Sequence, residues 1–204
     1  MTRFPSFLRW IYPGAVWNIP AHSKVVYLTF DDGPTPIITT TVLNLLAEYQ
    51  AKGTFFCIGK NCEEHPDLFL EIVQKGHHIG SHTYSHLNGW KVSADEYLQD
   101  YSKGRELVGS NLFRPPYGRL LLKPLQSIQK QDRVVMWDLL SKDYDVKMEP
   151  KTILKNIKKN LRPGSIIVFH DSQKAAKNLM AVLPPLLQYL KQEGYTMEAI
   201  PYTS

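Results

Sequence analysis

The sequence predicts a single α/β domain whose core is a set of parallel strands. Strand-like and helix-like segments alternate about seven times along the chain, which is typical of a parallel α/β barrel or an open sheet. A chain of 204 residues can form one core without splitting into several domains. With 43% hydrophobic and 21% charged residues, the composition is that of an ordinary globular protein and excludes global disorder, collagen and coiled coils.

Strands are predicted where short runs rich in β-branched and aromatic residues lie between turn residues. In chain order these runs are 25–30, 54–58, 77–80, 112–113, 134–136, 165–169 and 196–200. Helices are predicted between them, where apolar residues recur at helical spacing. Their ranges are 38–49, 66–76, 93–108, 120–131, 153–162 and 179–190. Pro66 opens the second helix, Ser93 and Glu96 form a capping box for the third, and Pro184-Pro185 should kink the last.

The most informative polar residues lie where predicted strands end. Those at or just past the carboxyl end of a strand are Asp31-Asp32, His82, Arg114, Trp137 and His170. In α/β folds this edge of the sheet carries the chemistry. Ordinary solvent-exposed loops would rarely place so many of these residue types at the strand ends. These residues therefore predict a functional site at this edge of the sheet.

Asp31 and Asp32 can serve one pocket only if the strand ends at them. Neighbours in a continuing strand point to opposite faces of the sheet, and Gly33-Pro34 supplies the ending. Adjacent carboxylates repel each other, so each needs a metal ion or an arginine nearby. The alternative interpretation of the same four residues is an ordinary turn.

His82 and His86 are candidate metal ligands. Histidines four residues apart share one face of a helical turn and can bind one metal ion. One aspartate added to the pair gives a three-ligand set with open positions for water and substrate. Taken alone, the histidine spacing is only a modest signal.

Two further segments carry candidate catalytic groups. The prolines within 114–118 stiffen the chain, so the N–H of Tyr117 is held rigidly and could donate to an oxyanion, unless the segment is simply a rigid loop. His170 follows a buried strand and is either a core residue or an acid/base group. Asp138 and Asp143 both follow another strand and could orient it.

Together these segments resemble the polysaccharide deacetylases, the NodB-homology domain of carbohydrate esterase family 4. The five ordered motifs of that family match Thr29-Phe30-Asp31-Asp32-Gly33, His82-Thr83-Tyr84-Ser85-His86, Arg114-Pro115-Pro116-Tyr117, Trp137 through Asp143-Tyr144, and Val168-Phe169-His170-Asp171. The resemblance implies a catalytic domain over residues 24–204, preceded by an N-terminal extension over 1–23.

The resemblance also implies a fold and a reaction. The fold is a distorted (β/α) barrel with about seven parallel strands. The reaction is hydrolysis of an acetyl group, usually the N-acetyl group of an amino sugar and less often an O-acetyl group on xylan, assisted by one divalent metal ion, usually zinc. The positions that match the family motifs imply that Asp32, His82 and His86 bind the metal ion. They imply that Asp31 is the general base, kept ionised by Arg114, and that His170 is the general acid, whose pKa is tuned by Asp143. The Tyr117 N–H would be the oxyanion donor, and Trp137 and Val168 would line the acetyl pocket.

The sequence departs from the family pattern at a few positions, which affects the expected substrate more than the chemistry. Leu140 and Tyr144 replace residues of the fourth motif, where an aspartate and a tryptophan are usual. Val168 stands where leucine is common, and Leu87 replaces a proline often found after the second histidine.

Two other classes of protein compete with this interpretation. A non-haem Fe(II) oxygenase also uses two histidines and a carboxylate, but it needs neither Asp31 nor His170 and rarely has a βα repeat. A non-catalytic glycan-binding relative should have lost one of these two residues. The basic stretch 151–159 has the pattern of a solvated helix face, so no nucleic acid is expected as a partner.

Charge and composition set expectations about partners and location. Lys and Arg total 24 against 19 Asp and Glu, a net charge of +5 that suits an anionic polymer such as an acetylated wall glycan. Cys57 and Cys62 are expected to be free thiols. No apolar run is long enough to span a membrane. The N-terminus lacks a clear export signal, and its absence predicts a cytoplasmic protein. An exported or cell-envelope location would follow if a signal had been removed.

Overall fold

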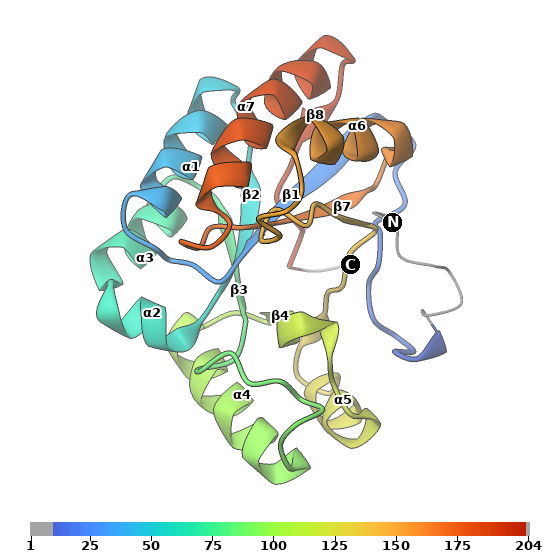
Figure 1. The fold of residues 1–204 in the computed structure, drawn as a ribbon. Coiled ribbons are helices and arrows are strands. Elements are labelled where there is room, and N and C mark those ends of the chain that lie inside the picture. Colours follow the sequence, from blue (N-terminus) through green and yellow to red (C-terminus); the bar gives the residue numbers. More distant parts are fainter. Residues whose placement is uncertain (1–9, 203–204) are drawn as a thin grey trace.

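The computed structural model describes residues 10–202, and its centre is one curved sheet of parallel strands (Figure 1). In this part of the chain the strand order is β5-β4-β3-β2-β1-β7-β6, and β8 pairs with β1 outside that path. The strands are β1 (Val25–Asp31), β2 (Gly53–Cys57), β3 (His78–Ser81), β4 (Leu112–Phe113), β5 (Arg133–Val134), β6 (Leu139–Leu140), β7 (Ile166–His170) and β8 (Thr196–Met197). The predicted distorted (β/α) barrel is thereby confirmed.

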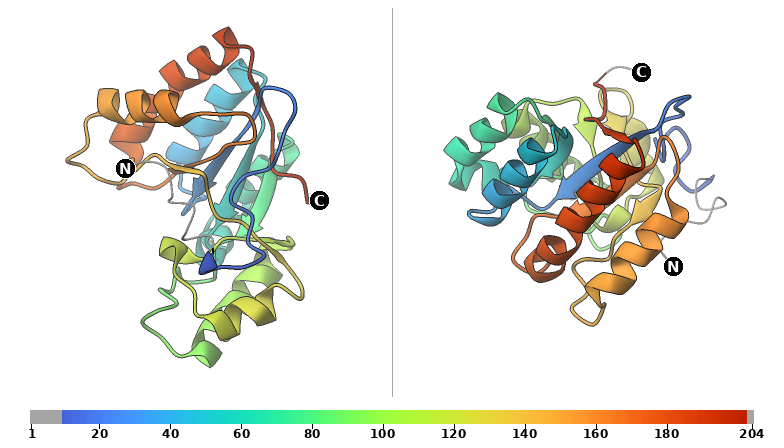
Figure 2. Two further views of the ribbon diagram at one scale, coloured as in Figure 1. Left: turned by 90° about the vertical axis from the view of Figure 1, so that its right-hand side faces the viewer. Right: turned by 90° about the horizontal axis from the view of Figure 1, so that it is seen from above.

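The helices lie around the outside of this sheet (Figure 2). They are α1 (Ile38–Glu48), α2 (Gly59–Glu64), α3 (Pro66–Gln74), α4 (Ala94–Val108), α5 (Leu122–Ile128), α6 (Pro150–Asn160) and α7 (Ala176–Gln192). The predicted cap of α4 is confirmed, because the Ser93 hydroxyl accepts a hydrogen bond from the Glu96 N–H at 3.2 Å. Helix α7 continues through Pro184 and Pro185. No helix within residues 10–202 has both the length and the apolar character that a membrane crossing requires.

Some predicted boundaries were wrong where elements are very short. Helix α2 and strand β6 were not predicted, because they have only six and two residues and therefore no measurable periodicity. The strand predicted over 134–136 ends at Val134, because Val135 leaves β5 and bridges to Val16 instead.

The two faces of β1 explain where the site lies. Val26, Leu28 and Phe30 pack into the hydrophobic cluster shared with α1 and α7 on the outside of the sheet. Tyr27 packs into the second cluster, inside the barrel. Because side chains alternate along a strand, Asp31 follows Tyr27 on the inner face and stands at the carboxyl end of the barrel interior.

Part of the predicted N-terminal extension belongs to the packed domain. The Val16 N–H donates to the Val134 carbonyl at 2.8 Å, next to the end of β5. The Ile19 N–H donates to the Gly164 carbonyl at 3.0 Å, just before β7. This segment therefore contacts both sides of the barrel opening. Residues 1–9, on which the argument about an export signal largely depended, lie outside the described residues.

Candidate active site

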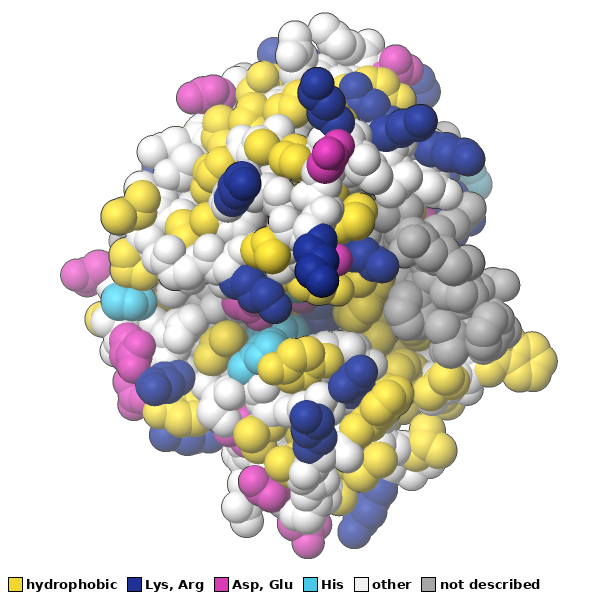
Figure 3. All heavy atoms as spheres, in the orientation of Figure 1, with side chains coloured by type: hydrophobic (Ala, Val, Ile, Leu, Met, Phe, Trp, Pro, Cys, Tyr) yellow, Lys and Arg dark blue, Asp and Glu magenta, His cyan; other side chains and the backbone are white. Residues whose placement is uncertain are grey.

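A cleft of about 700 Å³ opens at the carboxyl ends of the strands. Eight of the predicted site residues line it, namely Asp31, Asp32, His82, His86, Tyr117, Trp137, Val168 and His170. On this face of the molecule, Figure 3 shows a hollow with histidine side chains at its edge and Lys and Arg side chains around it. The other two predicted residues, Arg114 and Asp143, are buried behind the cleft wall.

The side chains of Asp32, His82 and His86 converge on one point. Their potential ligand atoms all lie within 4.8 Å of one another. Asp32 Oδ1 lies 3.3 Å from His86 Nε2 and 3.9 Å from His82 Nε2. This oxygen is buried and has no hydrogen-bond partner, although a buried carboxylate oxygen is costly without one. Carboxylate and imidazole atoms in this arrangement fit a divalent cation such as zinc.

Hydrogen bonding and burial prepare both histidines as ligands. His82 Nδ1 lies 2.7 Å from the Arg114 carbonyl oxygen, which can only accept, so Nδ1 carries the proton and Nε2 presents its lone pair toward Asp32. Burial lowers the pKa of His82 well below 6.5, and the neighbouring His86 adds to this. Burial also lowers the pKa of His86, while Asp32 opposes that effect. Both imidazoles are therefore neutral, as a metal ligand must be.

The predicted helical turn over residues 82–86 was wrong, although the two histidines do meet. Thr83 and His86 have φ angles of 63° and 60°, in the left-handed region, which no right-handed helix contains. Asp100 of α4 holds this loop: its Oδ2 accepts from the N–H groups of Tyr84 and Ser85, each at 3.1 Å. A side chain distant in sequence thus replaces the hydrogen bonds of a helical turn.

Gly104 lets α4 approach this loop closely, and we expect Gly104→Ala to disturb it. A Cβ atom at this position would lie 2.5 Å from the backbone carbonyl carbon of Thr83. The variant should lose about 1–3 kcal/mol of unfolding free energy, as overpacked sites do, and bind zinc less tightly. Denaturant unfolding and a zinc titration measure both effects. Glu106→Ala, at an exposed position of the same helix, is the control; wild-type stability and zinc affinity in Gly104→Ala would contradict the expectation.

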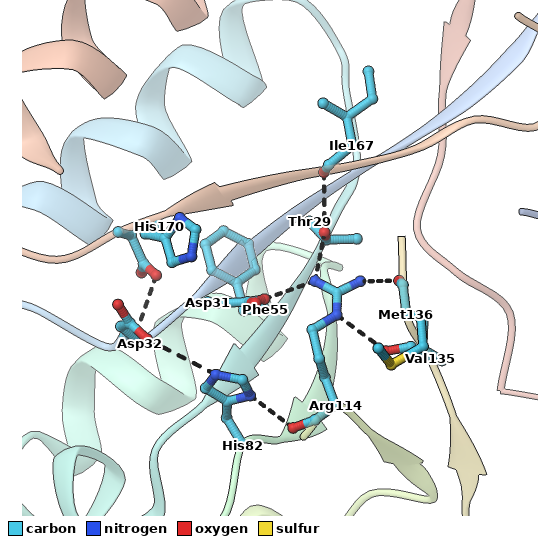
Figure 4. Close-up of polar contacts among 12 residues, drawn as sticks. Thr29, Asp31, Asp32, Phe55, His82, Arg114, Val135, Met136, Ile167 and His170 are labelled. Atoms are coloured by element: carbon cyan, nitrogen blue, oxygen red, sulfur yellow. Dashed lines mark hydrogen bonds and ion pairs between the residues drawn. The ribbon is translucent and has the colours of Figure 1, made fainter. Parts of the chain in front are cut away.

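Asp31 forms a buried ion pair with Arg114 (Figure 4). Arg114 Nη1 donates to Asp31 Oδ1 and to the Thr29 hydroxyl, both at 2.7 Å. The remaining guanidinium nitrogens donate to the carbonyls of Val135 and Met136 at 3.1 and 2.9 Å. Every nitrogen of this fully buried cation is thus occupied, and the orientation of the Asp31 carboxylate is fixed.

Burial shifts the pKa of Asp31 in the direction opposite to the one expected from Arg114 alone. Burial of the carboxylate raises this pKa above 3.8, and the attraction of Arg114 counteracts the increase without cancelling it. A carboxylate with a raised pKa is a stronger proton acceptor and therefore a better general base near neutral pH.

His170 is paired with Asp143. The His170 ring Nδ1 and backbone N each lie 2.8 Å from an oxygen of the Asp143 carboxylate. Burial opposes the charged ring, but the hydrogen bond and negative charge of Asp143 outweigh it and raise the pKa of His170 to about 9. Asp138, the other candidate partner, instead forms an ion pair with Arg162 at 2.9 Å. His170 is thus an imidazolium at neutral pH, able to donate a proton from Nε2.

Tyr117 lines the cleft beside His86. Its φ is 59°, and its ring lies 4.6 Å from the His86 ring, centroid to centroid. Within the described part of the chain, its backbone N–H has no hydrogen-bond acceptor. Leu140 and Tyr144, the residues that depart from the family pattern, also line the cleft. They therefore lie where they can affect which substrate fits.

Asp171 supports the site, a role that was not predicted from the sequence. Its buried carboxylate accepts from the Gly33 N–H at 3.1 Å and from the Thr39 hydroxyl at 2.5 Å. A Cβ atom on Gly33 would lie 2.1 Å from this carboxylate, so only glycine fits there. Asp171 thereby fixes the chain directly after Asp32, whose φ of 81° ends β1 and lets both aspartates line the cleft. Its position next to His170 in the fifth motif was the available signal.

Comparisons with known proteins agree with this geometry. Residues 18–135 match the polysaccharide deacetylase family. A peptidoglycan-N-acetylglucosamine deacetylase of Bacillus cereus is 32% identical over 187 residues, which cover 88% of this chain and 87% of the relative. A chitooligosaccharide deacetylase of Azorhizobium caulinodans is 30% identical, with 92% of this chain and 98% of the relative covered.

A solved structure extends the agreement to the whole fold. The crystal structure of a peptidoglycan N-acetylglucosamine deacetylase superimposes with a TM-score of 0.89 at 30% identity and covers 97% of this chain and 96% of the other. The chain therefore belongs to the polysaccharide deacetylase family, the NodB-homology group of carbohydrate esterase family 4. It is a hydrolase of the deacetylase type, as the motifs indicated.

Proposed function

We propose that this protein is a divalent-metal-dependent deacetylase that removes N-acetyl groups from N-acetylglucosamine residues of a peptidoglycan- or chitin-like glycan. The observation that carries the proposal is the complete pair of acid and base groups around the Asp-His-His cluster. Asp31 is held by Arg114 on one side, and His170 is held by Asp143 on the other. The names of two similar relatives support the same substrates.

Asp32, His82 and His86 are the residues that would hold the metal ion. When bound, a divalent cation supplies Lewis acidity toward the acetyl carbonyl and lowers the pKa of a water molecule. Asp31 takes the proton from the attacking water, and Arg114 keeps the Asp31 carboxylate oriented for this transfer. The free N–H of Tyr117 donates to the oxygen that becomes negative during attack.

His170 favours an amide over an ester as the substrate. An amine is a poor leaving group until its nitrogen is protonated, and the imidazolium paired with Asp143 is a donor suited to that step. An O-acetylxylan esterase is the second candidate, but it depends less on a strong acid. A non-catalytic relative is disfavoured because Asp31 and His170 are both present and both placed in the cleft.

An acetate-release screen tests this proposal. We expect the protein to release acetate from chitooligosaccharides or peptidoglycan fragments, to lose this activity after chelation and to regain it when zinc is added. Acetylated xylan is the comparison substrate. Activity confined to xylan would contradict the proposed substrate, and full activity of metal-free protein would contradict the metal requirement.

A further inference from the structure

Two cations in the cleft have no part in the mechanism described above. Arg119 directly follows the short 3-10 helix at Pro116–Gly118, and Lys174 lies in the loop between β7 and α7. Both line the same cleft as the catalytic residues. Within residues 10–202, neither Arg119 nor Lys174 forms an ion pair with a carboxylate. Both positive charges therefore remain available to a ligand.

Aromatic rings hold these two cations in place. The Arg119 guanidinium lies 5.0 Å from the centre of the Trp90 ring, and Lys174 Nζ lies 5.6 Å from the centre of the Tyr144 ring. Cation–π contacts restrain long side chains that otherwise lose much rotamer entropy on binding. Both cations are thus partly ordered before a ligand arrives.

Each of the two cations lies near a different residue of the candidate site. Arg119 is two residues from Tyr117, whose ring contacts that of the candidate metal ligand His86. Lys174 contacts Tyr144, whose ring lies edge-on to His170 at 5.0 Å. A glycan bound with its acetyl group between His86 and His170 would therefore lie in the cleft that both cations line.

Little negative charge in the cleft opposes these cations. The acidic residues that line it are Asp31 and Asp32. Asp31 is paired with Arg114 at 2.7 Å, and Asp32 belongs to the candidate metal site. The remaining charge of the cleft mouth is positive, which attracts anionic ligands. Figure 3 shows Lys and Arg side chains gathered around this hollow.

Resting on the proposed function, we infer that Arg119 and Lys174 select glycans that carry carboxylates next to the reacting N-acetyl group. The carboxylate could come from the sugar itself, as in the lactyl ether of N-acetylmuramic acid, or from a peptide attached to that sugar. Arg119 can bind it in a bidentate manner, and Lys174 binds it as a point charge.

Matched oligosaccharides test this inference. Acetate release is compared between neutral chitooligosaccharides and glycan-strand fragments of equal length that alternate N-acetylglucosamine with N-acetylmuramic acid, with and without peptide stems. We expect a higher kcat/KM for the anionic fragments, and Arg119→Gln and Lys174→Gln should each reduce that preference about fivefold, mainly through KM. Arg119→Lys should retain part of it, and added salt should weaken it. A preference seen only with peptide stems would assign the recognised carboxylate to the peptide.

The control is Lys158→Gln, which removes the same charge from a similar contact. Lys158 Nζ lies 4.2 Å from the centre of the Tyr189 ring, away from the cleft. Equal kcat/KM for neutral and anionic substrates, unchanged in the variants, would overturn the inference while acetate release still supports the proposed function. Absence of acetate release from every substrate would instead contradict the proposed function. In that case calorimetric binding of the same oligosaccharides decides the inference, because equal affinities for both kinds would overturn it.

Discussion

Asp31→Asn should lower acetate release from N-acetylglucosamine oligomers by at least about 10²-fold. An amide has nearly the shape of the carboxylate and can still accept the hydrogen bond from Arg114, but it cannot take a proton from water. Asp31 is distinct from the three converging residues at the candidate metal site, so the zinc content of the variant should stay near one ion per chain. Steady-state kinetics and elemental analysis measure the two quantities.

The variant needs a check on folding, because it leaves the buried Arg114 cation without its counter-charge. Removal of one partner of a buried ion pair can cost about 3–5 kcal/mol. Circular dichroism at the assay temperature shows whether the variant is folded, and Asp67→Asn, at an exposed position in the first turn of α3, is the matched control. If zinc content and activity fall together in folded protein, Asp31 is a metal ligand and the roles given to the two aspartates are wrong.

The sequence was most informative where strands end. A buried strand followed by a polar residue places that residue at one edge of a parallel sheet, whatever the details of the loops. For this reason Asp31, His82 and His170 could be assigned to one site from the sequence alone. The structure brings all three into one cleft.

Features that depend on contacts between distant segments could not be predicted. Spacing alone favoured a helical turn for His82 and His86, because nothing near them in sequence reveals that Asp100 binds the backbone of their loop. The sequence also could not distinguish Asp138 from Asp143 as the partner of His170, since both follow the same strand. Asp138 forms an ion pair with Arg162, and Asp143 is the partner of His170.

His170→Ala should strongly reduce hydrolysis of the N-acetyl substrate and affect an activated aryl acetate ester much less. The attack of water on the acetyl carbonyl, with Asp31 as the base, does not require His170 in either reaction. Only the amine needs a proton to leave, because a phenolate is a stable leaving group without one. The ratio of the two losses, measured by acetate release and by absorbance, therefore reports directly on proton donation.

Asp143→Asn should move the alkaline limb of the pH–rate profile of amide hydrolysis to lower pH. A general acid works only while protonated, so activity is present below the pKa of His170 and lost as pH rises through it. That pKa is about 9 with Asp143 present, and a cation bound at the candidate metal site would place the observed limb at or below this value. Without the carboxylate, burial of the ring lowers the pKa, so the protonated fraction falls at lower pH.

The same profiles on the aryl ester are the control for this shift, because that reaction does not require the acid. We expect the alkaline limb of ester hydrolysis to be the same in wild type and Asp143→Asn. The Ser141 hydroxyl donates to the same carboxylate at 2.9 Å, so Ser141→Ala tests whether an Asp143 with one hydrogen bond fewer keeps the limb in place. Equal losses of amide and ester hydrolysis in His170→Ala, together with an unmoved limb in Asp143→Asn, would mean that His170 shapes the cleft without donating the proton.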